Sequence, residues 1–344
     1  MAKIIATIGP KSNEPSILKE LAGKVDYFRI NMSHTDERDI ESRVKELLPY
    51  DVPIILDTEG PQVRSGNTYR LNFNEGDQVH LYNREVDCND STLFFTPFHV
   101  TDSFQIGDKI SLAFYSVLFQ VNDLSKKEEG YIAVKVIHGG ALDSRKAVHI
   151  ESQNFSLPIF SPKDYKAFEI GNNFRISHYT LSFTESEEDV KTFRQFCPNA
   201  KAYSKIESMK GLENFKEIAQ EADGILIDRG DLSSQVPIEL IPLIQKNIIN
   251  YCNAIGKPVF IATDTLQHMF ENRRPNAADA NDIINTLIDG ASGIALTKET
   301  AIGKYPIETV NMLTKMIEVS ERFREGRHLF TPNFLEELIK DNSK

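Results

Sequence analysis

Charged side chains stand at the ends of two consecutive strand-like segments. Lys205 and Glu207 close the run Lys201–Glu207, where the two-residue period of a strand places both on one face. Asp231 closes the following run, Gly224–Asp231. Two carboxylates on neighbouring strand ends suit Mg²⁺ or Mn²⁺, which keeps its remaining positions for water and substrate oxygens. Lys205 beside that metal could stabilise an enolate or a transferring phosphoryl group, because charge develops there in the transition state.

The same spacing has a second interpretation. A buried lysine and a glutamate on one face of a strand can form a salt bridge inside the protein, with no catalytic role. Spacing alone favours neither interpretation of Lys205 and Glu207.

Polar residues also end two strand-like segments nearer the N-terminus. Arg29, Asn31 and Ser33 alternate with apolar residues, so the strand period puts these three side chains on one face. The next such segment closes with Asp57 and Thr58. The polar groups thus gather at the C-terminal ends of the predicted strands.

The order of elements predicts how these ends are brought together. Short apolar runs alternate with amphipathic stretches of helical period, as in parallel βαβ units. Eight segments resemble strands: Lys3–Gly9, Asp26–Ser33, Pro53–Glu59, Arg175–Phe183, Lys201–Glu207, Gly224–Asp231, Pro258–Thr263 and Gly293–Glu299. We therefore predict the α/β class and a (β/α)₈ TIM barrel, in which active sites lie at the C-terminal strand ends.

Residues 67–149 break this alternation. They are rich in Phe, Val and Ile, with turn sequences and without a helical period. We predict a small all-β barrel domain inserted as a lid after strand 3. The barrel then comprises residues 1–66 and 150–325. Residues 326–344 form a C-terminal tail, either a helix that packs or contacts a second subunit or a frayed end, and we favour packing.

Composition narrows the function classes. The 344 residues carry a net charge of −11, which repels nucleic acid, and no apolar run approaches the roughly 20 residues of a membrane span. The three cysteines form no CxxC pair, and the N-terminus runs directly into a predicted strand rather than a secretory leader. We expect a cytoplasmic protein with small-molecule partners.

Several motifs, taken in order, resemble those of pyruvate kinases. They cover the predicted barrel from its first strand to its last, and the ordered series is far more specific than any single motif. The matching stretches are Ala6–Pro10, Phe28–His34, Leu56–Gly66, Ser204–Glu207, Asp223–Leu232, Gly256–Thr263 and Leu296–Ala301.

The resemblance implies roles at the reacting end of the substrate. Glu207 and Asp231 would hold the divalent metal, and Lys205 would lie over the transferring phosphoryl group and the enolate oxygen. Arg29 would contact phosphate, and Thr263 would lie near the methylene carbon that gains a proton. Gly230 would join Arg29, Lys205, Asp231 and Thr263 in binding substrate.

The resemblance also implies two further sites. The family's monovalent-cation site, normally occupied by potassium, matches Asn31, Ser33, Asp57 and Thr58. Nucleotide contacts would come from Pro10, His34, Arg64 and Lys146. The expected reaction transfers phosphate between phosphoenolpyruvate and ADP, with a divalent metal and potassium, to give pyruvate and ATP.

Two other functions stay open. The metal and enolate half of the site could serve a lyase or a specialised biosynthetic enzyme that uses phosphoenolpyruvate, pyruvate or a related 2-oxo acid with another acceptor. The chain could also be a non-catalytic binding barrel, although the presence of Lys205, Glu207, Asp231 and Thr263 argues against decay of the site.

Departures from the family pattern concern the lid and the acceptor side. Glu59 stands where the family has lysine, Ala113-Phe114-Tyr115 replaces an acidic turn, and Ser233 replaces glycine. The runs Asp264–Met269 and Ala277–Asp279 also differ. No match to the family's C-terminal effector domain follows the barrel, so we expect hyperbolic kinetics, no response to sugar bisphosphates, and a monomer or homodimer.

Overall fold

The chain divides into two compact units, each with its own sheet and hydrophobic core. The computed structural model describes residues 1–113, 115–150 and 157–325. The first unit contains Met1–Gly60 and the chain from Ile159 onward, and the second is Pro61–Pro158. The predicted tail, residues 326–344, and Phe114 of the run Ala113-Phe114-Tyr115 lie outside the described residues.

Eight parallel strands of the first unit close into a ring. Each pairs with two neighbours, and β1 meets both β2 and the last strand, β17. In ring order the strands are β1 (Lys3–Thr7), β2 (Tyr27–Asn31), β3 (Ile54–Asp57), β13 (His178–Leu181), β14 (Lys201–Ile206), β15 (Gly224–Asp228), β16 (Val259–Ala262) and β17 (Gly293–Leu296). The predicted (β/α)₈ barrel is confirmed.

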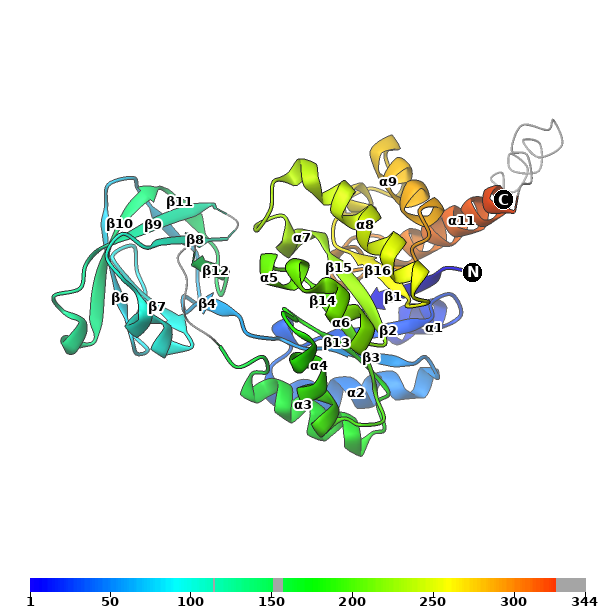
Figure 1. The fold of residues 1–344 in the computed structure, drawn as a ribbon, viewed down its shortest axis with the longest axis horizontal. Helices are drawn as coiled ribbons and strands as arrows, with labels where there is room; N and C mark the ends of the chain where they lie inside the picture. Colours follow the sequence, from blue (N-terminus) through cyan, green and yellow to red (C-terminus); the bar gives the residue numbers. More distant parts are fainter. Residues whose placement is uncertain (114, 151–156, 326–344) are drawn as a thin grey trace. The chain divides into compact units, whose positions relative to one another are not determined.

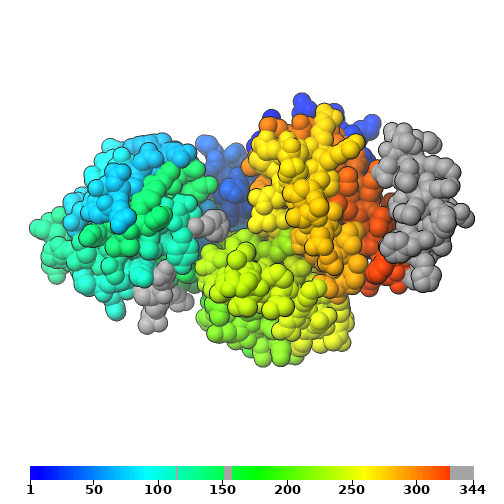
Figure 2. Space-filling view, turned by 90° about the horizontal axis from the view of Figure 1, so that it is seen from above, coloured from blue at the N-terminus to red at the C-terminus, as the bar shows by residue number. Residues whose placement is uncertain are grey.

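Helices lie around this ring (Figure 1). They are α1 (Pro15–Ala22), α2 (Ile40–Leu47), α3 (Pro162–Asn173), α4 (Glu187–Phe196), α5 (Met209–Glu213), α6 (Phe215–Glu221), α7 (Arg229–Leu232), α8 (Ile241–Ala254), α9 (Ala277–Ile288), α10 (Lys298–Ala301) and α11 (Pro306–Arg324). Figure 2 shows blue N-terminal residues beside orange residues from the C-terminal part of the chain, and the pairing of β1 with β17 joins these two parts of the sequence. Within the described ranges, none of the helices combines the length and hydropathy needed to cross a bilayer.

The start of α3 is tied to the turn that follows β3. Ser161 and Asp164 form a capping box, in which each side chain accepts the other residue's N–H. The same Asp164 carboxylate accepts the N–H groups of Glu59 at 2.7 Å and Gly60 at 3.0 Å. One buried aspartate therefore fixes a helix start and the turn after the polar end of β3.

The inside of the barrel changes character along its axis. Apolar and aromatic side chains fill one layer, made of Ile5, Tyr27, Ile55, Tyr203, Leu226, Phe260, Ala262 and Ala295. The strand residues that follow these on the same face are polar, and they include Arg29, Asp57 and Lys205. The apolar layer thus forms a floor beneath a charged layer at the C-terminal strand ends.

The second unit is the predicted all-β barrel. Seven strands close in the order β10 (Tyr131–His138), β6 (Gln78–Tyr82), β7 (Thr92–Thr96), β4 (Val63–Ser65), β12 (Ala147–Ile150), β8 (Lys109–Leu112) and β9 (Val117–Asp123). A separate pair joins β5 (Leu71–Phe73) to β11 (Gly140–Leu142). Its core includes Phe73 and Phe119, whose rings meet edge to face at 5.1 Å.

Three boundaries differ from the sequence-based prediction. Strand β4 pairs with β7 and β12, so Val63–Ser65 belong to the second sheet rather than to the first barrel segment, 1–66. Ser33 lies in a 3₁₀ turn, Met32–His34, and not on the face of β2. Asp231 lies on the short helix α7, since β15 ends at Asp228. The two strands end early because Asn31 and Asp228 accept N–H bonds from Ser33 and Gly230, which turn the backbone.

A histidine stands among aromatic rings near the N-terminal end of the barrel. His178 begins β13, with its ring 5.1 Å from Tyr27 and stacked at 6.1 Å on Tyr203. Burial, helped by the positive charges of Lys201 and Lys3, lowers the pKa of His178 from 6.5 to about 4. Between pH 6.5 and about 4, the folded protein therefore keeps this imidazole neutral, whereas the unfolded chain would protonate it.

We expect this histidine to make the barrel less stable in mild acid. Between pH 6.5 and about 4 the unfolded chain binds a proton that the folded state does not, so the free energy of unfolding falls as pH falls. His178→Phe should flatten this dependence in urea unfolding at pH 7, 6 and 5, whereas the exposed His138→Gln should not. An identical slope for His178→Phe and the parent would contradict the assignment.

Candidate active site

Lys205 lies at the centre of the charged layer, on β14. Its Nζ is 2.8 Å from Glu207 Oε1, 3.5 Å from Asp57 Oδ1 and 3.7 Å from Asp228 Oδ2. It also donates to Ser182 Oγ at 3.1 Å, and only 5% of Lys205 is exposed. Burial acts to lower the pKa of Lys205, but the three carboxylates outweigh it and raise that pKa. The ammonium is held charged inside the barrel.

Arg29 on β2 supplies the second cation. Its Nη2 pairs with Asp57 Oδ2, and its Nη1 donates to Thr7 Oγ1 at 2.7 Å. Thr180 donates to the other oxygen of Asp57. Burial acts to raise the pKa of Asp57, but the charges of Arg29 and Lys205 outweigh it and hold that pKa below its ordinary value. Asp57 is therefore an ionised link between Arg29 and Lys205.

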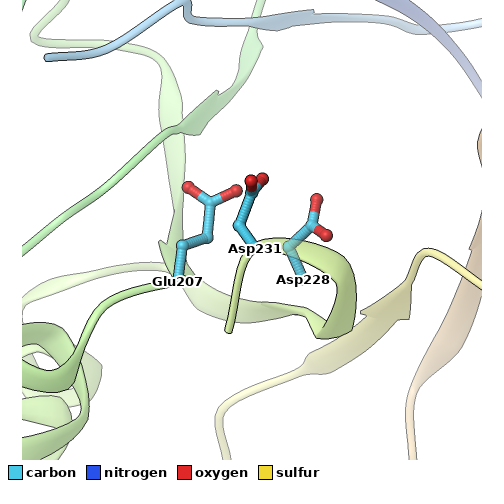
Figure 3. Close-up of side chains that lie close together, drawn as sticks. All are labelled: Glu207, Asp228 and Asp231. Atoms are coloured by element: carbon cyan, nitrogen blue, oxygen red, sulfur yellow. The ribbon is translucent and has the colours of Figure 1, made fainter. Parts of the chain in front are cut away.

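Three carboxylates face one another beside Lys205. Glu207 follows β14, Asp228 ends β15 and Asp231 lies on α7, and one oxygen of each lies within 4.8 Å of the others. Figure 3 shows the three side chains pointing to the same side of the backbone. Burial, together with the negative charges of Asp231 and Asp228, raises the pKa of Glu207 to about 8, against the opposing effect of Lys205. The oxygen-only donor set of these three carboxylates fits a hard divalent cation.

The loop after β16 brings Thr263 to this group. Thr263, Asp264 and Leu266 have φ of 68°, 55° and 52°, in the left-handed region that favours glycine. Arg229 holds the loop by donating to the carbonyl oxygens of Thr263 (3.1 Å) and Asp264 (3.0 Å), and it pairs with Asp282 at 2.7 Å. Left-handed backbone held in this way is typical of functional sites.

The residues expected to bind potassium lie on two adjoining strand ends. Asn31 and Asp57 are register partners on β2 and β3. Asn31 Oδ1 accepts the Ser33 N–H at 2.9 Å, and Thr58 Oγ1 accepts the Ser182 N–H at 2.9 Å. The structure therefore brings Asn31, Ser33, Asp57 and Thr58 into one region, with Asp57 already bonded to Arg29.

The residues expected to bind nucleotide divide between the two units. Pro10 and His34 belong to the first unit. Arg64 and Lys146 belong to the second, where β4 and β12 make them near neighbours. Arg64 Nη1 donates to the Arg145 carbonyl at 3.1 Å, and the Lys146 N–H donates to Ser65 Oγ at 2.9 Å.

One departure from the family pattern is compensated locally. The Glu59 carboxylate, which stands where a lysine was expected, pairs with Lys163 Nζ of α3 at 2.8 Å. The reversed charge is therefore balanced within the first unit. At another departure, Ser233 Oγ donates to the Gly230 carbonyl at 2.7 Å, which adds a bond inside α7.

Asp228 is the site residue that sequence reasoning missed. The two-residue period of β15 places it on the same face as Leu226, which lines the barrel interior. The predicted strand ended at Asp231 and not at Asp228, so the sequence assigned Asp228 no role beyond the motif Asp223–Leu232. Ser182 and Thr180 were also missed, because their bonds to Lys205 and Asp57 join different strands and form only in the folded barrel.

Comparisons with known proteins place this geometry in a family. A family model for the pyruvate kinase barrel domain matches residues 1–310. The chain is 34% identical to a pyruvate kinase of Thermococcus litoralis over 94% of its length and 31% identical to one of Thermotoga maritima over 93%. It is 32% identical to a pyruvate kinase of Geobacillus stearothermophilus over 96%. These alignments cover 70%, 71% and 58% of the three relatives.

The fold and the comparisons define a (β/α)₈-barrel phosphotransferase with an inserted β-barrel. The chain belongs to the pyruvate kinase family, and its function is pyruvate kinase-like.

Proposed function

We propose that the chain transfers a phosphoryl group between phosphoenolpyruvate and ADP to give pyruvate and ATP. The observation that supports this most directly is Lys205, an ammonium within 3.7 Å of three carboxylates at the C-terminal strand ends. Such a cation stabilises charge that develops on a transferring phosphoryl group or on an enolate oxygen. The names of the relatives support the choice of substrates.

The metal would be held by Glu207 and Asp231. The carboxylate chemistry and the raised pKa of Glu207 fit a divalent cation, Mg²⁺ or Mn²⁺. When bound, this cation supplies positive charge that orients substrate oxygens and lowers the energy of an enolate. Lys205 Nζ, fixed by Glu207 and Asp57, would contact the transferring phosphoryl group, and Arg29 would bind its oxygens.

Thr263 would act at the carbon end of the substrate. Its half-buried hydroxyl donates a hydrogen bond to Asp228, and Arg229 holds its backbone. Gly230 and Asp231 would border the substrate beside it. The Gly230 N–H is directed at Asp228, at 3.2 Å, so its contact with substrate would come through close approach of its backbone.

Potassium and nucleotide complete the proposal. Asn31, Ser33, Asp57 and Thr58 would hold K⁺ through oxygen atoms, and Pro10, His34, Arg64 and Lys146 would contact the nucleotide. A cytoplasmic location and assembly as a monomer or homodimer stay predictions.

The reaction is tested by incubating the chain with phosphoenolpyruvate, ADP and Mg²⁺ in potassium buffer. Pyruvate, followed through lactate dehydrogenase, and ATP, followed by luciferase, should appear in equal amounts and only with metal. Exchange of pyruvate methyl protons without ATP formation would instead select an enolate enzyme with another acceptor. No change in any substrate would favour the binding barrel.

The metal assignment predicts the effect of two substitutions. Glu207→Gln and Asp231→Asn should each weaken Mn²⁺ binding by at least about tenfold, because a neutral amide replaces a charged ligand. Electron paramagnetic resonance of free Mn²⁺ measures this directly. Asp289→Asn, in a surface pair with Lys246, is the matched control and should bind Mn²⁺ as the parent does. Parent-like affinity in both site variants would refute the assignment.

Lys205→Met should separate phosphoryl transfer from metal binding. We expect turnover to fall by at least about 10²-fold, the scale of one lost electrostatic stabiliser, while Mn²⁺ binding remains detectable. Lys191→Met, which removes a surface lysine paired with Glu188, should stay within about twofold of the parent. A fully active Lys205→Met protein would return Lys205 to a salt-bridge role.

Potassium should activate the enzyme. Oxygen donors from two strand ends suit a hard monovalent cation, and Thr58→Val, which removes one of them, should weaken the activation. Initial rates in K⁺, Na⁺ and tetramethylammonium give the comparison, and equal rates in all three would remove the site from the proposal.

A further inference from the structure

Asp228 has a position that none of the expected roles explains. It is the last residue of β15, it is 6% exposed, and its side chain lies in the barrel interior between Lys205 and Thr263. Its Oδ2 faces Lys205, which would contact phosphate, and its Oδ1 faces Thr263, which would lie near the substrate carbon. Asp228 therefore connects these two residues.

The shortest contact of Asp228 is with the threonine hydroxyl. Thr263 Oγ1 donates to Asp228 Oδ1 at 2.6 Å, a length typical of a hydroxyl bound to a charged acceptor. The Gly230 N–H reaches the same oxygen at 3.2 Å, and Lys205 Nζ lies 3.7 Å from Oδ2. With its proton on Asp228, Thr263 presents oxygen lone pairs, not a donor, to any group on its other side.

The surrounding backbone maintains this contact. A β-carbon on Gly230 would lie 2.7 Å from Thr263 Cγ2, so only glycine at that position lets the threonine approach. Thr263 itself has a φ of 68°, and Arg229 binds its carbonyl oxygen at 3.1 Å. Three neighbouring features therefore fix the hydroxyl against Asp228.

Asp228 also lies close enough to Glu207 and Asp231 to act as a third metal ligand. Its hydrogen bonds favour a different use. Oδ1 already accepts two N–H or O–H donors, and Oδ2 faces the ammonium of Lys205. A metal on Oδ1 would compete with the 2.6 Å hydroxyl bond.

We propose that Asp228 is a positioning residue that acts through Thr263 as the end of a two-step proton relay. The inference rests on the proposed function. It adds the path by which the proton at the substrate carbon is exchanged.

The relay balances in both directions. When pyruvate forms its enolate, Thr263 Oγ1 takes a methyl proton as its own hydroxyl proton moves to Asp228 Oδ1. The electron pair of the broken C–H bond becomes the enolate double bond. In the reverse direction Asp228 starts protonated, the enolate carbon takes the Thr263 proton as its double-bond electrons form the C–H bond, and Asp228 returns its proton to Oγ1. Between turnovers Asp228 exchanges its proton with water, and this exchange brings solvent protons to the relay.

The test compares proton exchange with phosphoryl transfer in the same variants. Exchange of pyruvate methyl protons in D₂O with Mg²⁺ and K⁺ is followed by NMR, and ATP formation from phosphoenolpyruvate and ADP is measured separately. In Asp228→Ala we expect exchange to fall by about 10²-fold, the usual scale of general acid–base catalysis. ATP formation should fall less, so that the ratio of exchange to transfer drops by at least about tenfold.

Two further variants distinguish a relay from a structural role. Asp228→Asn keeps an oxygen that accepts from Thr263 but takes up no proton at neutral pH, so exchange should be as slow as in Asp228→Ala. Asp228→Ala/Thr263→Val should exchange no more slowly than Thr263→Val alone, because both residues serve one step. The control is Thr265→Val, a buried threonine whose hydroxyl faces the Ala295 carbonyl, and its ratio should match the parent.

Failure of the proposed function and failure of the Asp228 relay give different results. A parent protein that makes no ATP refutes the proposed function. A parent that makes ATP, with an unchanged exchange ratio in Asp228→Ala or Asp228→Asn, refutes only the relay. Additive losses in the double variant would show that Asp228 and Thr263 act in separate steps and would overturn the relay. A fall of more than about tenfold in Mn²⁺ affinity for Asp228→Ala would make Asp228 a metal ligand and would also overturn it.

Discussion

An ammonium surrounded by carboxylates inside a barrel is the interaction on which the site depends. Lys205 is buried, and a buried charge is tolerated only when it is paired and hydrogen-bonded. Asp57, Glu207 and Asp228 supply that pairing from three different strands or strand ends, and Arg29 balances Asp57 from a fourth. The network therefore sets the register of the polar layer above the apolar floor of the barrel.

Charged side chains also hold the loops around this network in place. Asp164 holds the turn after β3, Arg229 holds the loop after β16, and Asp228 caps α7 while it accepts from Thr263. Each of these charged side chains binds backbone groups of a neighbouring element. Because the strands are only four to six residues long, such contacts position the catalytic groups more directly than the sheet itself does.

The fold was predictable because buried strands and helices repeat apolar residues at a fixed spacing in the sequence. All eight barrel strands were found, and the absence of helical period in residues 67–149 predicted the second barrel. Local turns were harder: Ser33 and Asp231 were placed on strands because an apolar period does not register the Asx-type bonds of Asn31 and Asp228. The pairing of Glu59 with Lys163 was also beyond prediction, since the two residues lie 104 positions apart and meet only in the folded barrel.

Closure of the barrel has a consequence for how the chain is made. Ile4 of β1 pairs with Ile294 of β17, the last strand of the barrel. One edge of β1 therefore stays unpaired until β17 has been synthesised. Contacts of such long sequence separation slow folding, and exposed strand edges invite association in the meantime. The second unit is one continuous stretch with its own core, so it can fold during synthesis while β1, β2 and β3 still lack β13 and the strands beyond it. We therefore expect the edges of β1 to β3 to stay exposed for longer during synthesis than those of the second unit.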